Sequence, residues 1–245
     1  GGDALGLVLD DEAALQARLL SERVETVAGR QVHRGRIDGH EVLLALAGIG
    51  KVAAATTTAV LLDRYAVQTL LFTGVAGGLA EGVRVGDVVV GSSFLQHDMD
   101  ASPLFPRWEV PGTGRARFDA DARLAQALAD ASAEVMAQPP AALSSFGISA
   151  PRWHRGLVLS GDVFVSSAAA CARLREDHPD ALAVEMEGAA VAQVCADFGR
   201  PFGVVRTISD RADDQAHVDF PRFLAEVAAD CSRDIVLATL RRLAA

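Results

Sequence analysis

The sequence is poor in cysteine, in basic residues and in long uncharged runs, and each shortage argues against a class of protein. Its three cysteines are an odd number without C-x-x-C spacing, which argues against a disulfide framework and a zinc site and predicts a reduced, cytoplasmic chain. Basic residues are in deficit, with 23 Lys and Arg against 32 Asp and Glu, so the net charge of −9 disfavours binding to nucleic acid or anionic membranes. The longest uncharged run, residues 135–151, is broken by proline, glutamine and serine, so no membrane span is predicted.

What is present is enough apolar material for one large core, since 50% of the 245 residues are hydrophobic. Strand-like and helix-like patterns alternate over most of the length, which is typical of α/β proteins. We therefore predict one domain over residues 1–245, with three layers, α/β/α, around a central mixed β-sheet. No internal repeat or low-complexity segment interrupts it.

The hydrophobic pattern places the elements along the chain. Buried strands are expected at 4–9, 69–73, 88–91, 156–159, 181–184 and 202–208, and helices at 51–63, 119–133, 188–198 and 219–243. Asp38-Gly39 predicts a hairpin between strands at 30–36 and 41–47. After the first strand, Leu15, Leu19 and Leu20 recur at helical spacing.

Three segments follow neither period. The glycines of 74–78 are expected to end the strand at 69–73 and to let the backbone approach a ligand closely. Residues 96–117 are irregular and rich in proline, glycine and aromatics, so they are expected to build a site or an interface. Residues 136–155 are interpreted as a surface excursion or a mobile loop.

Carboxylates at the carboxyl ends of strands are the main chemical signal. Glu12, Glu187 and Asp210 each follow a predicted strand, and ligands of open α/β sheets gather outside those ends. The three side chains are therefore expected to converge. Each of them, taken alone, is better explained as an acid that caps a helix or interacts favourably with the helix dipole.

Eight strings of the sequence, in this order and at these intervals, resemble one family, the 5′-methylthioadenosine/S-adenosylhomocysteine nucleosidases of the purine nucleoside phosphorylase superfamily. The resemblance covers nearly the whole chain, and VEMEG followed by VRTISD after SGDVF is its most specific part. It implies a nucleoside phosphorylase-like fold. The strings are LDDE at 9–12, GIGK at 48–51, TGVAGG at 73–78, VGD at 85–87, HDMD at 97–100, SGDVF at 160–164, and the pair VEMEG at 184–188 and VRTISD at 205–210.

That resemblance implies hydrolysis of the bond between purine N9 and ribose C1′ in a 5′-modified adenosine. The reaction needs an activated water, a proton for the leaving purine and a grip on the ribose. By position in the motifs, Glu12 is the general base with Arg206 orienting the carboxylate or the water, and Asp210 is the acid that serves purine N7. An ordinary aspartate has a pKa of about 3.9 and is ionised at neutral pH. Burial or a hydrogen bond must therefore raise the pKa of Asp210 or let it pass a proton on to N7. Ser209 is the candidate hydrogen-bond partner.

The remaining substrate contacts also follow from the resemblance. Glu187 accepts hydrogen bonds from the ribose hydroxyls, and Met186 lines the ribose. Phe164 stacks on the purine, while Val165 offers backbone groups to its edge. Without the motif, each apolar residue of this set would be interpreted as ordinary core. Three further positions are assigned to the substrate pocket: Leu9, Ile49 and Val75.

The HDMD string admits two interpretations. A histidine and two carboxylates within residues 97–100 are a possible start of a divalent metal site, but no second pair completes it. In the resembled family the segment that follows approaches the neighbouring subunit's active site. The resemblance thus implies a homodimer with no metal or organic cofactor, in which an apolar wall for the 5′ group is supplied by Leu104, Phe105, Trp108 and Pro111.

The sequence departs from the family pattern mainly on the 5′ side. It lacks the GAM string before the acidic cluster, Val75 stands where the family often has serine, an FGY-type string is missing from 103–111, and 136–155 is longer. Nucleosidase chemistry is therefore better supported than methylthioadenosine as the substrate.

Four alternative functions stay open at this stage. A purine nucleoside phosphorylase would need cationic or backbone donors for phosphate, which Glu12 would repel. A nucleosidase for another 5′-substituted nucleoside, such as a futalosine-like one, fits the same motifs. A nucleoside-binding protein without turnover would not need Glu12, Glu187 and Asp210 together. A dinucleotide-binding oxidoreductase is disfavoured because 74–78 does not form G-x-G-x-x-G.

Overall fold

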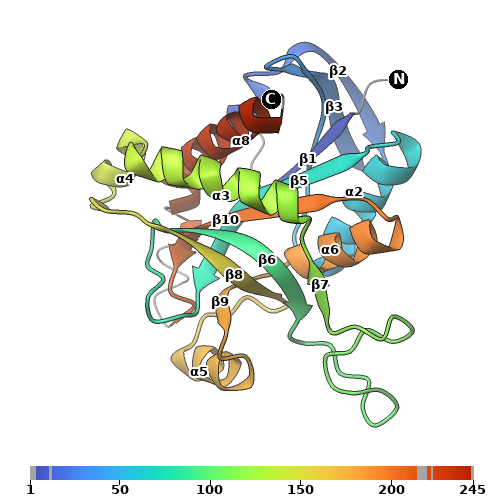
Figure 1. Cartoon of the computed structure of the whole chain (residues 1–245), viewed down its shortest axis with the longest axis vertical. Helices are drawn as coiled ribbons and strands as arrows, with labels where there is room; N and C mark the ends of the chain where they lie inside the picture. Colours follow the sequence, from blue (N-terminus) through green and yellow to red (C-terminus); the bar gives the residue numbers. More distant parts are fainter. Residues whose placement is uncertain (1–3, 11–12, 214–219, 222, 244–245) are drawn as a thin grey trace.

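Buried strands and amphipathic helices alternate along the chain much as the hydrophobic pattern predicts (Figure 1). The computed structural model describes residues 4–10, 13–213, 220–221 and 223–243. The strands are β1 (Leu5–Leu9), β2 (Leu20–Val27), β3 (Arg30–Ile37), β4 (His40–Leu46), β5 (Thr69–Gly78), β6 (Val88–Gln96), β7 (Arg117–Asp119), β8 (Trp153–Ser160), β9 (Ala181–Glu185) and β10 (Phe202–Asp210). The helices are α1 (Ala13–Gln16), α2 (Lys51–Arg64), α3 (Ala122–Ala137), α4 (Ala141–Ser145), α5 (Ala168–Asp177), α6 (Gly188–Asp197), the π-helical turn η1 (Leu224–Ala228) and α8 (Ala229–Leu243).

These strands form one mixed sheet in the order β10-β6-β8-β9-β5-β1-β4-β3-β2, with β7 paired to β6. β10 also pairs with β5, so one half of the sheet closes on itself. β1 runs parallel to β4 and β5, and β5 runs parallel to β10. The carboxyl ends of β1, β5 and β10 therefore meet at one edge, where β9 also crosses the end of β5.

Helices cover both faces of the sheet (Figure 1). Alternate side chains of β1 point to opposite faces, so Leu7 and Leu9 pack in the core beneath α3 and α8, whereas Val8 packs in the core beneath α2 and α6. The same alternation in β5 sends Leu71 to the first core and Phe72 to the second. The prediction of a three-layer α/β/α domain with a central mixed sheet is confirmed.

Three local predictions differ from the structure, and one helix was missed. Leu20 opens strand β2 instead of continuing a helix, because α1 ends at Gln16. Residues 74–78 continue β5 rather than end it, since β10 supplies a parallel partner for their backbone. The segment 136–155 is partly ordered, with α4, a buried Leu143 and the first residues of β8 inside it. Helix α5 was not predicted.

Candidate active site

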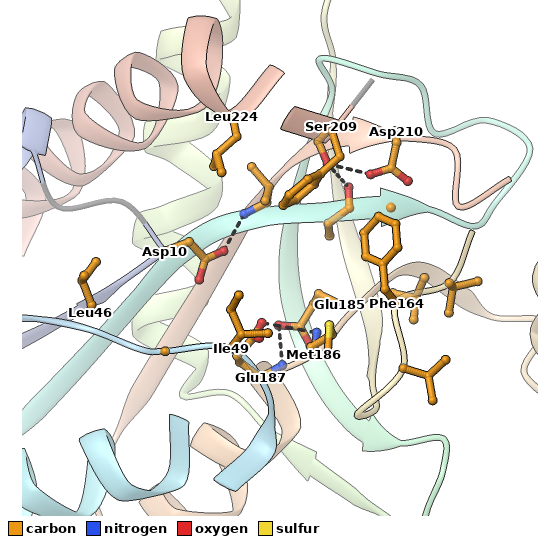
Figure 2. A pocket seen from close by; sticks show the side chains of 18 residues that line it. Asp10, Leu46, Ile49, Phe164, Glu185, Met186, Glu187, Ser209, Asp210 and Leu224 are labelled. Carbon is orange, nitrogen blue, oxygen red and sulfur yellow. Dashed lines mark hydrogen bonds between the residues drawn. The ribbon is translucent and has the colours of Figure 1, made fainter. Parts of the chain in front are cut away.

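A cavity of about 560 Å³ opens where β1, β5, β9 and β10 end (Figure 2). This is the edge at which the sequence predicts carboxylates to converge. Figure 2 shows Asp10 and Asp210 on opposite sides of it, with Glu187 and Met186 between them. Its lining consists of Asp10, Leu46, Gly48, Ile49, Val75, Ala76, Gly77, Val163, Phe164, Val165, Val184, Glu185, Met186, Glu187, Ser209, Asp210, Phe220 and Leu224.

One guanidinium, that of Arg206 in β10, holds the charged end of the cavity together. Its side chain has no exposed surface and lies over the Phe72 ring, 3.9 Å from the ring centroid. Nη1 is 3.1 Å from Asp10 Oδ2, and Nη2 donates to Glu185 and is 3.8 Å from Glu187 Oε2. Burial alone would lower the pKa of Arg206, but the three carboxylates raise it, so the guanidinium stays charged.

Glu185 anchors this cluster. Its carboxylate accepts the backbone N–H of Gly188 at 3.0 and 2.8 Å and that of Glu187 at 3.3 Å, and it also accepts the Ser160 hydroxyl and the Arg206 guanidinium. Four donors, one of them shared between the two oxygens, occupy the carboxylate, which leaves little capacity for a ligand. Glu185 therefore positions Arg206 and the start of α6.

Glu187 is the carboxylate that remains available. Oε1 accepts the backbone N–H of Gly50 at 2.9 Å, an orientation that the φ of +90° at Gly50 allows, and Oε2 accepts the N–H of Met186 at 3.3 Å. Burial first, and then repulsion by Glu185, raise the pKa of Glu187 to about 7 against the lowering effect of Arg206. Glu187 thus titrates near neutral pH, a property common among groups that contact substrates.

The other end of the cavity combines an acid with aromatic rings. Asp210 is buried, with Oδ2 accepting the Ser209 hydroxyl at 2.8 Å and Oδ1 accepting the backbone N–H of Ala212 at 2.8 Å. Phe164 meets Phe220 edge to face, with centroids 5.5 Å apart and planes at 69°. A flat, apolar slot beside a hydrogen-bonded carboxyl group suits a heteroaromatic ring with polar edge atoms.

Most sequence-predicted site residues meet in this cavity. Arg206 lies directly behind its carboxylates. Leu9 does not line it, because the side chain points into the core under α3 and α8. Glu12 lies outside the described residues. The predicted residues that line the cavity are Ile49, Val75, Phe164, Val165, Met186, Glu187, Ser209 and Asp210.

The residues expected to form the 5′ wall lie elsewhere in this chain. None of Leu104, Phe105, Trp108 and Pro111 is among the described residues that line the cavity. Leu104 is 85% exposed, and the Trp108 ring is 4.5 Å from the His178 ring. The loop that carries them extends away from the sheet (Figure 1). Their prediction as a wall supplied by a second subunit is not tested within one chain.

Sequence reasoning missed several lining residues. Asp10 belongs to the LDDE string at 9–12, but nothing in the string distinguishes it from its neighbours. Phe220 and Leu224 belong to a segment predicted as a closing helix, and Leu46 and Val184 lie near the ends of predicted strands, so no sequence signal marked their apolar side chains as lining a cavity.

The described residues also bear on metal binding and on the presence of a membrane span. Among them, no three His, Cys, Asp or Glu side chains gather as metal ligands would. Asp98 of the HDMD string instead pairs with Lys51 at 2.6 Å and accepts the backbone N–H of Asp162 at 2.8 Å. In the same part of the chain, no helix is both long and apolar enough to span a membrane.

Comparison with known proteins agrees with this geometry. A family model described as the phosphorylase superfamily matches residues 4–241. The 5′-methylthioadenosine/S-adenosylhomocysteine nucleosidase of Colwellia psychrerythraea, solved with adenine, is 34% identical, with a TM-score of 0.89 over 99% of this chain and 96% of that one. The enzyme of the same name from Neisseria meningitidis, solved with methylthio-immucillin-A, is 33% identical, with a TM-score of 0.85 over 98% and 99%. Futalosine hydrolase of Helicobacter pylori is 30% identical, with a TM-score of 0.83 over 98% of each chain.

The chain therefore belongs to the phosphorylase superfamily, and it is an enzyme of the nucleosidase class found there. The resemblance to the 5′-methylthioadenosine/S-adenosylhomocysteine nucleosidases that its motifs indicate is confirmed. Solved structures at about this level of identity to the chain thus include both 5′-methylthioadenosine/S-adenosylhomocysteine nucleosidases and a futalosine hydrolase.

Proposed function

We propose that the protein hydrolyses the N-glycosidic bond of a 5′-modified adenosine of the methylthioadenosine and S-adenosylhomocysteine class, releasing adenine and the modified ribose. The observation that carries this proposal is the arrangement of one cavity, with Asp210 beside an aromatic slot at one end and Glu187 and Asp10 toward the other. Cleavage of a bond between a base and a sugar needs an acid at the base and carboxylates around the sugar.

The aromatic end accommodates the purine in this proposal. Phe164 stacks on the ring system, and the backbone of Val165 reads its edge. Asp210 serves N7, helped by the Ser209 hydroxyl that binds its Oδ2 at 2.8 Å. A proton placed on N7 makes the purine a better leaving group, because the electron pair of the broken bond no longer has to stay on an anion.

Glu187 and Met186 hold the ribose. An ionised carboxylate accepts hydrogen bonds from two adjacent hydroxyls at once. The backbone N–H of Gly50 fixes the Glu187 carboxylate from the side away from Met186. Val75 and Ile49 complete the lining of this part. Water activation by Glu12 stays a prediction, since Glu12 lies outside the described residues.

The charge balance favours water over phosphate as the nucleophile. Asp10, Glu185 and Glu187 surround the single guanidinium of Arg206, which is already bonded to the first two. The described residues that line the cavity include no lysine or arginine. A phosphate dianion would meet uncompensated negative charge here. Hydrolysis is therefore favoured over phosphorolysis.

The cavity opens to the surface beside apolar side chains. Ile49 and Val163 line it and are 83% and 59% exposed, respectively. We propose that a second copy of the chain covers this mouth and contributes Leu104, Phe105, Trp108 and Pro111 as the wall for the 5′ group. Large exposed apolar side chains around a functional cavity are typical of protein interfaces.

In solution we expect a dimer of twice the 25.6 kDa chain mass, measured by light scattering at micromolar concentration. Leu104→Asp should shift the protein toward monomer. It should also lower kcat/KM for substrates with an apolar 5′ group about tenfold, which is the loss expected when one apolar side chain is removed from a pocket. Leu20→Asp changes another exposed leucine, on β2, and serves as the matched control. A wild-type monomer would contradict the shared site.

We propose a cytoplasmic location as well. Cys171, Cys195 and Cys231 are all free and buried, as expected for a chain that works under reducing conditions. No metal or organic cofactor is part of the proposed reaction, since an acid, a base and water complete it.

The proposed function is tested with purified protein and a panel of nucleosides. Release of the free purine base is measured from methylthioadenosine, S-adenosylhomocysteine, adenosine and a futalosine-like 5′-substituted nucleoside. We expect the first two to give the highest kcat/KM. Preference for the futalosine-like nucleoside would overturn the substrate class but keep the nucleosidase, and failure to cleave any of them would overturn the function.

A further inference from the structure

A hydrogen-bonded ring beside the cavity joins three of the motifs, GIGK, HDMD and SGDVF, and the proposed chemistry makes no use of it. The backbone N–H of Lys51 donates to Asp162 Oδ1 at 2.7 Å, and the backbone N–H of Asp162 donates to Asp98 Oδ2 at 2.8 Å. Lys51 Nζ donates to Asp98 Oδ1 at 2.6 Å and closes the ring. None of the three is among the described residues that line the cavity. The ring therefore links three loops without being part of the cavity wall.

The topology of the sheet brings these loops together. β6 runs parallel to β8, with Gln96 opposite Ser160, so the HDMD and SGDVF strings leave neighbouring strands at one edge. Gly161 lets the two strings lie close, because a methyl group there would overlap the His97 ring. Lys51 reaches the same edge from the start of α2, and its Nζ also donates to Gln96 at 3.1 Å. The ring is thus held from three elements.

Two successive N–H groups at the start of α2 donate to carboxylates from two separate segments. The Gly50 N–H donates to Glu187 Oε1 at 2.9 Å, and the next N–H, that of Lys51, donates to Asp162. Because the first N–H groups of a helix have no partner within it, Asp162 acts as a cap supplied by another loop. Gly50 fits between the two carboxylates because it has no side chain, since a methyl group there would lie 3.0 Å from Asp162 Oδ1. The direction of the Gly50 N–H is therefore tied to Asp162.

Asp98 holds the SGDVF loop independently of the Asp162 side chain. It accepts the backbone N–H of Asp162, which every residue except proline would supply at that position. Burial would raise the pKa of Asp98, but the hydrogen bonds from Lys51 and from the Asp162 N–H lower it below its ordinary value, so both oxygens stay ionised acceptors. Phe164 and Val165, which line the cavity, follow two and three residues later. Removal of the Asp162 carboxylate should therefore leave the aromatic slot in place.

We propose that Asp162 is a positioning residue that aims the Gly50 N–H at Glu187 and thereby fixes the carboxylate that holds the ribose hydroxyls. This inference rests on the proposed function and deepens it. Asp162 lies outside the cavity and acts only through the backbone at the start of α2. Without its carboxylate the start of α2 loses this anchor, and Glu187 loses the fixed donor that orients Oε1. Its other contacts in the described part of the chain, Arg206 Nη2 at 3.8 Å and the Met186 N–H at 3.3 Å, both face Oε2.

The test uses adenosine and 2′-deoxyadenosine, which differ by one ribose hydroxyl, as competitive inhibitors of methylthioadenosine hydrolysis. The wild type should bind adenosine more tightly, because ionised Glu187 accepts a hydrogen bond from that hydroxyl. In Asp162→Ala this preference should fall about tenfold, the loss of one oriented hydrogen bond to a charged group, and kcat/KM for methylthioadenosine should fall by a similar factor. The inhibition constant of adenine should change by less than about twofold, because contacts with the base are independent of Asp162. Asp162→Asn keeps an oxygen for the Lys51 N–H and should restore most of the preference.

Asp63→Ala is the matched control, because Asp63 is exposed near the other end of α2 and undergoes the same change. It should leave all three inhibition constants unchanged, and thermal unfolding shows whether each variant is folded. The inference is overturned if the preference in Asp162→Ala stays within about threefold of the wild-type value, or if adenosine, 2′-deoxyadenosine and adenine all weaken by the same factor, as a general loss of order at the site would produce. It is also overturned if the wild type does not distinguish the two nucleosides. A wild type that cleaves no nucleoside would instead overturn the proposed function itself.

Discussion

Replacement of Asp210 by Asn is expected to lower kcat about 10³-fold while KM changes little. The variant keeps the size and most hydrogen bonds of the native side chain, which accepts from the Ser209 hydroxyl and from the Ala212 N–H, both at 2.8 Å. The amide nitrogen of Asn can donate a hydrogen bond to N7 but cannot transfer a proton. The departing purine would then carry negative charge as the bond to C1′ breaks.

Two comparisons separate a chemical role of Asp210 from a structural one. Ser209→Ala removes only the supporting hydroxyl and should cost about tenfold in kcat. Adenine should bind Asp210→Asn with an affinity close to that of the wild type, because Phe164 and Phe220 are unchanged. A kcat within threefold of the wild type in Asp210→Asn would remove Asp210 from the reaction.

Replacement of Arg206 by Met is expected to destabilise the fold by about 3–5 kcal/mol. Arg206 is fully buried and is the cation for Asp10, Glu185 and Glu187. Met fills much of the same space over the Phe72 ring but leaves those three carboxylates without their positive partner. Urea denaturation at pH 8, where the carboxylates are most ionised, measures the loss.

The loss should shrink as the pH falls. Asp10 already has a raised pKa and Glu187 one of about 7, and removal of the guanidinium would raise both further. A folded-state pKa above the unfolded value means that the folded protein binds more protons between the two values, so its stability falls as pH rises through that range. The difference between Arg206→Met and wild type is therefore larger at pH 8 than at pH 5.

Arg206→Lys is the informative control for this prediction. Its single ammonium group keeps the charge but cannot bridge Asp10 and Glu185 with two nitrogens in fixed geometry, so an intermediate stability is expected. An exposed ion pair contributes up to about 1 kcal/mol. If the free energy of unfolding of Arg206→Met at pH 8 is within about 1 kcal/mol of the wild-type value, Arg206 is not needed to stabilise these carboxylates in the folded protein.

Residues whose surroundings are local were predictable from the sequence. The hairpin at Asp38-Gly39 follows from a turn that needs positive φ, which both residues have. The apolar centre of β5 indicates burial on both faces, and the carboxylates that follow predicted strands indicated the edge at which the cavity lies. Asp210 and Glu187 were found because they end such strands or follow them closely.

Residues whose surroundings come from distant segments were not predictable in this way. The strand at 74–78 depends on β10, which lies about half the chain away. Asp10 becomes distinctive only because Arg206 and Gly74 meet it, and neither is near it in sequence. Leu9 was assigned to the pocket by its place in a motif, but the alternation of β1 turns it to the core.

The most direct test of the central claim is to incubate the purified enzyme with methylthioadenosine, with and without phosphate, and to identify the sugar product. The account predicts adenine release at the same rate in both reactions and a free sugar as the second product. Release that depends on phosphate and yields a sugar 1-phosphate would contradict it, because water would then not be the nucleophile in this cavity.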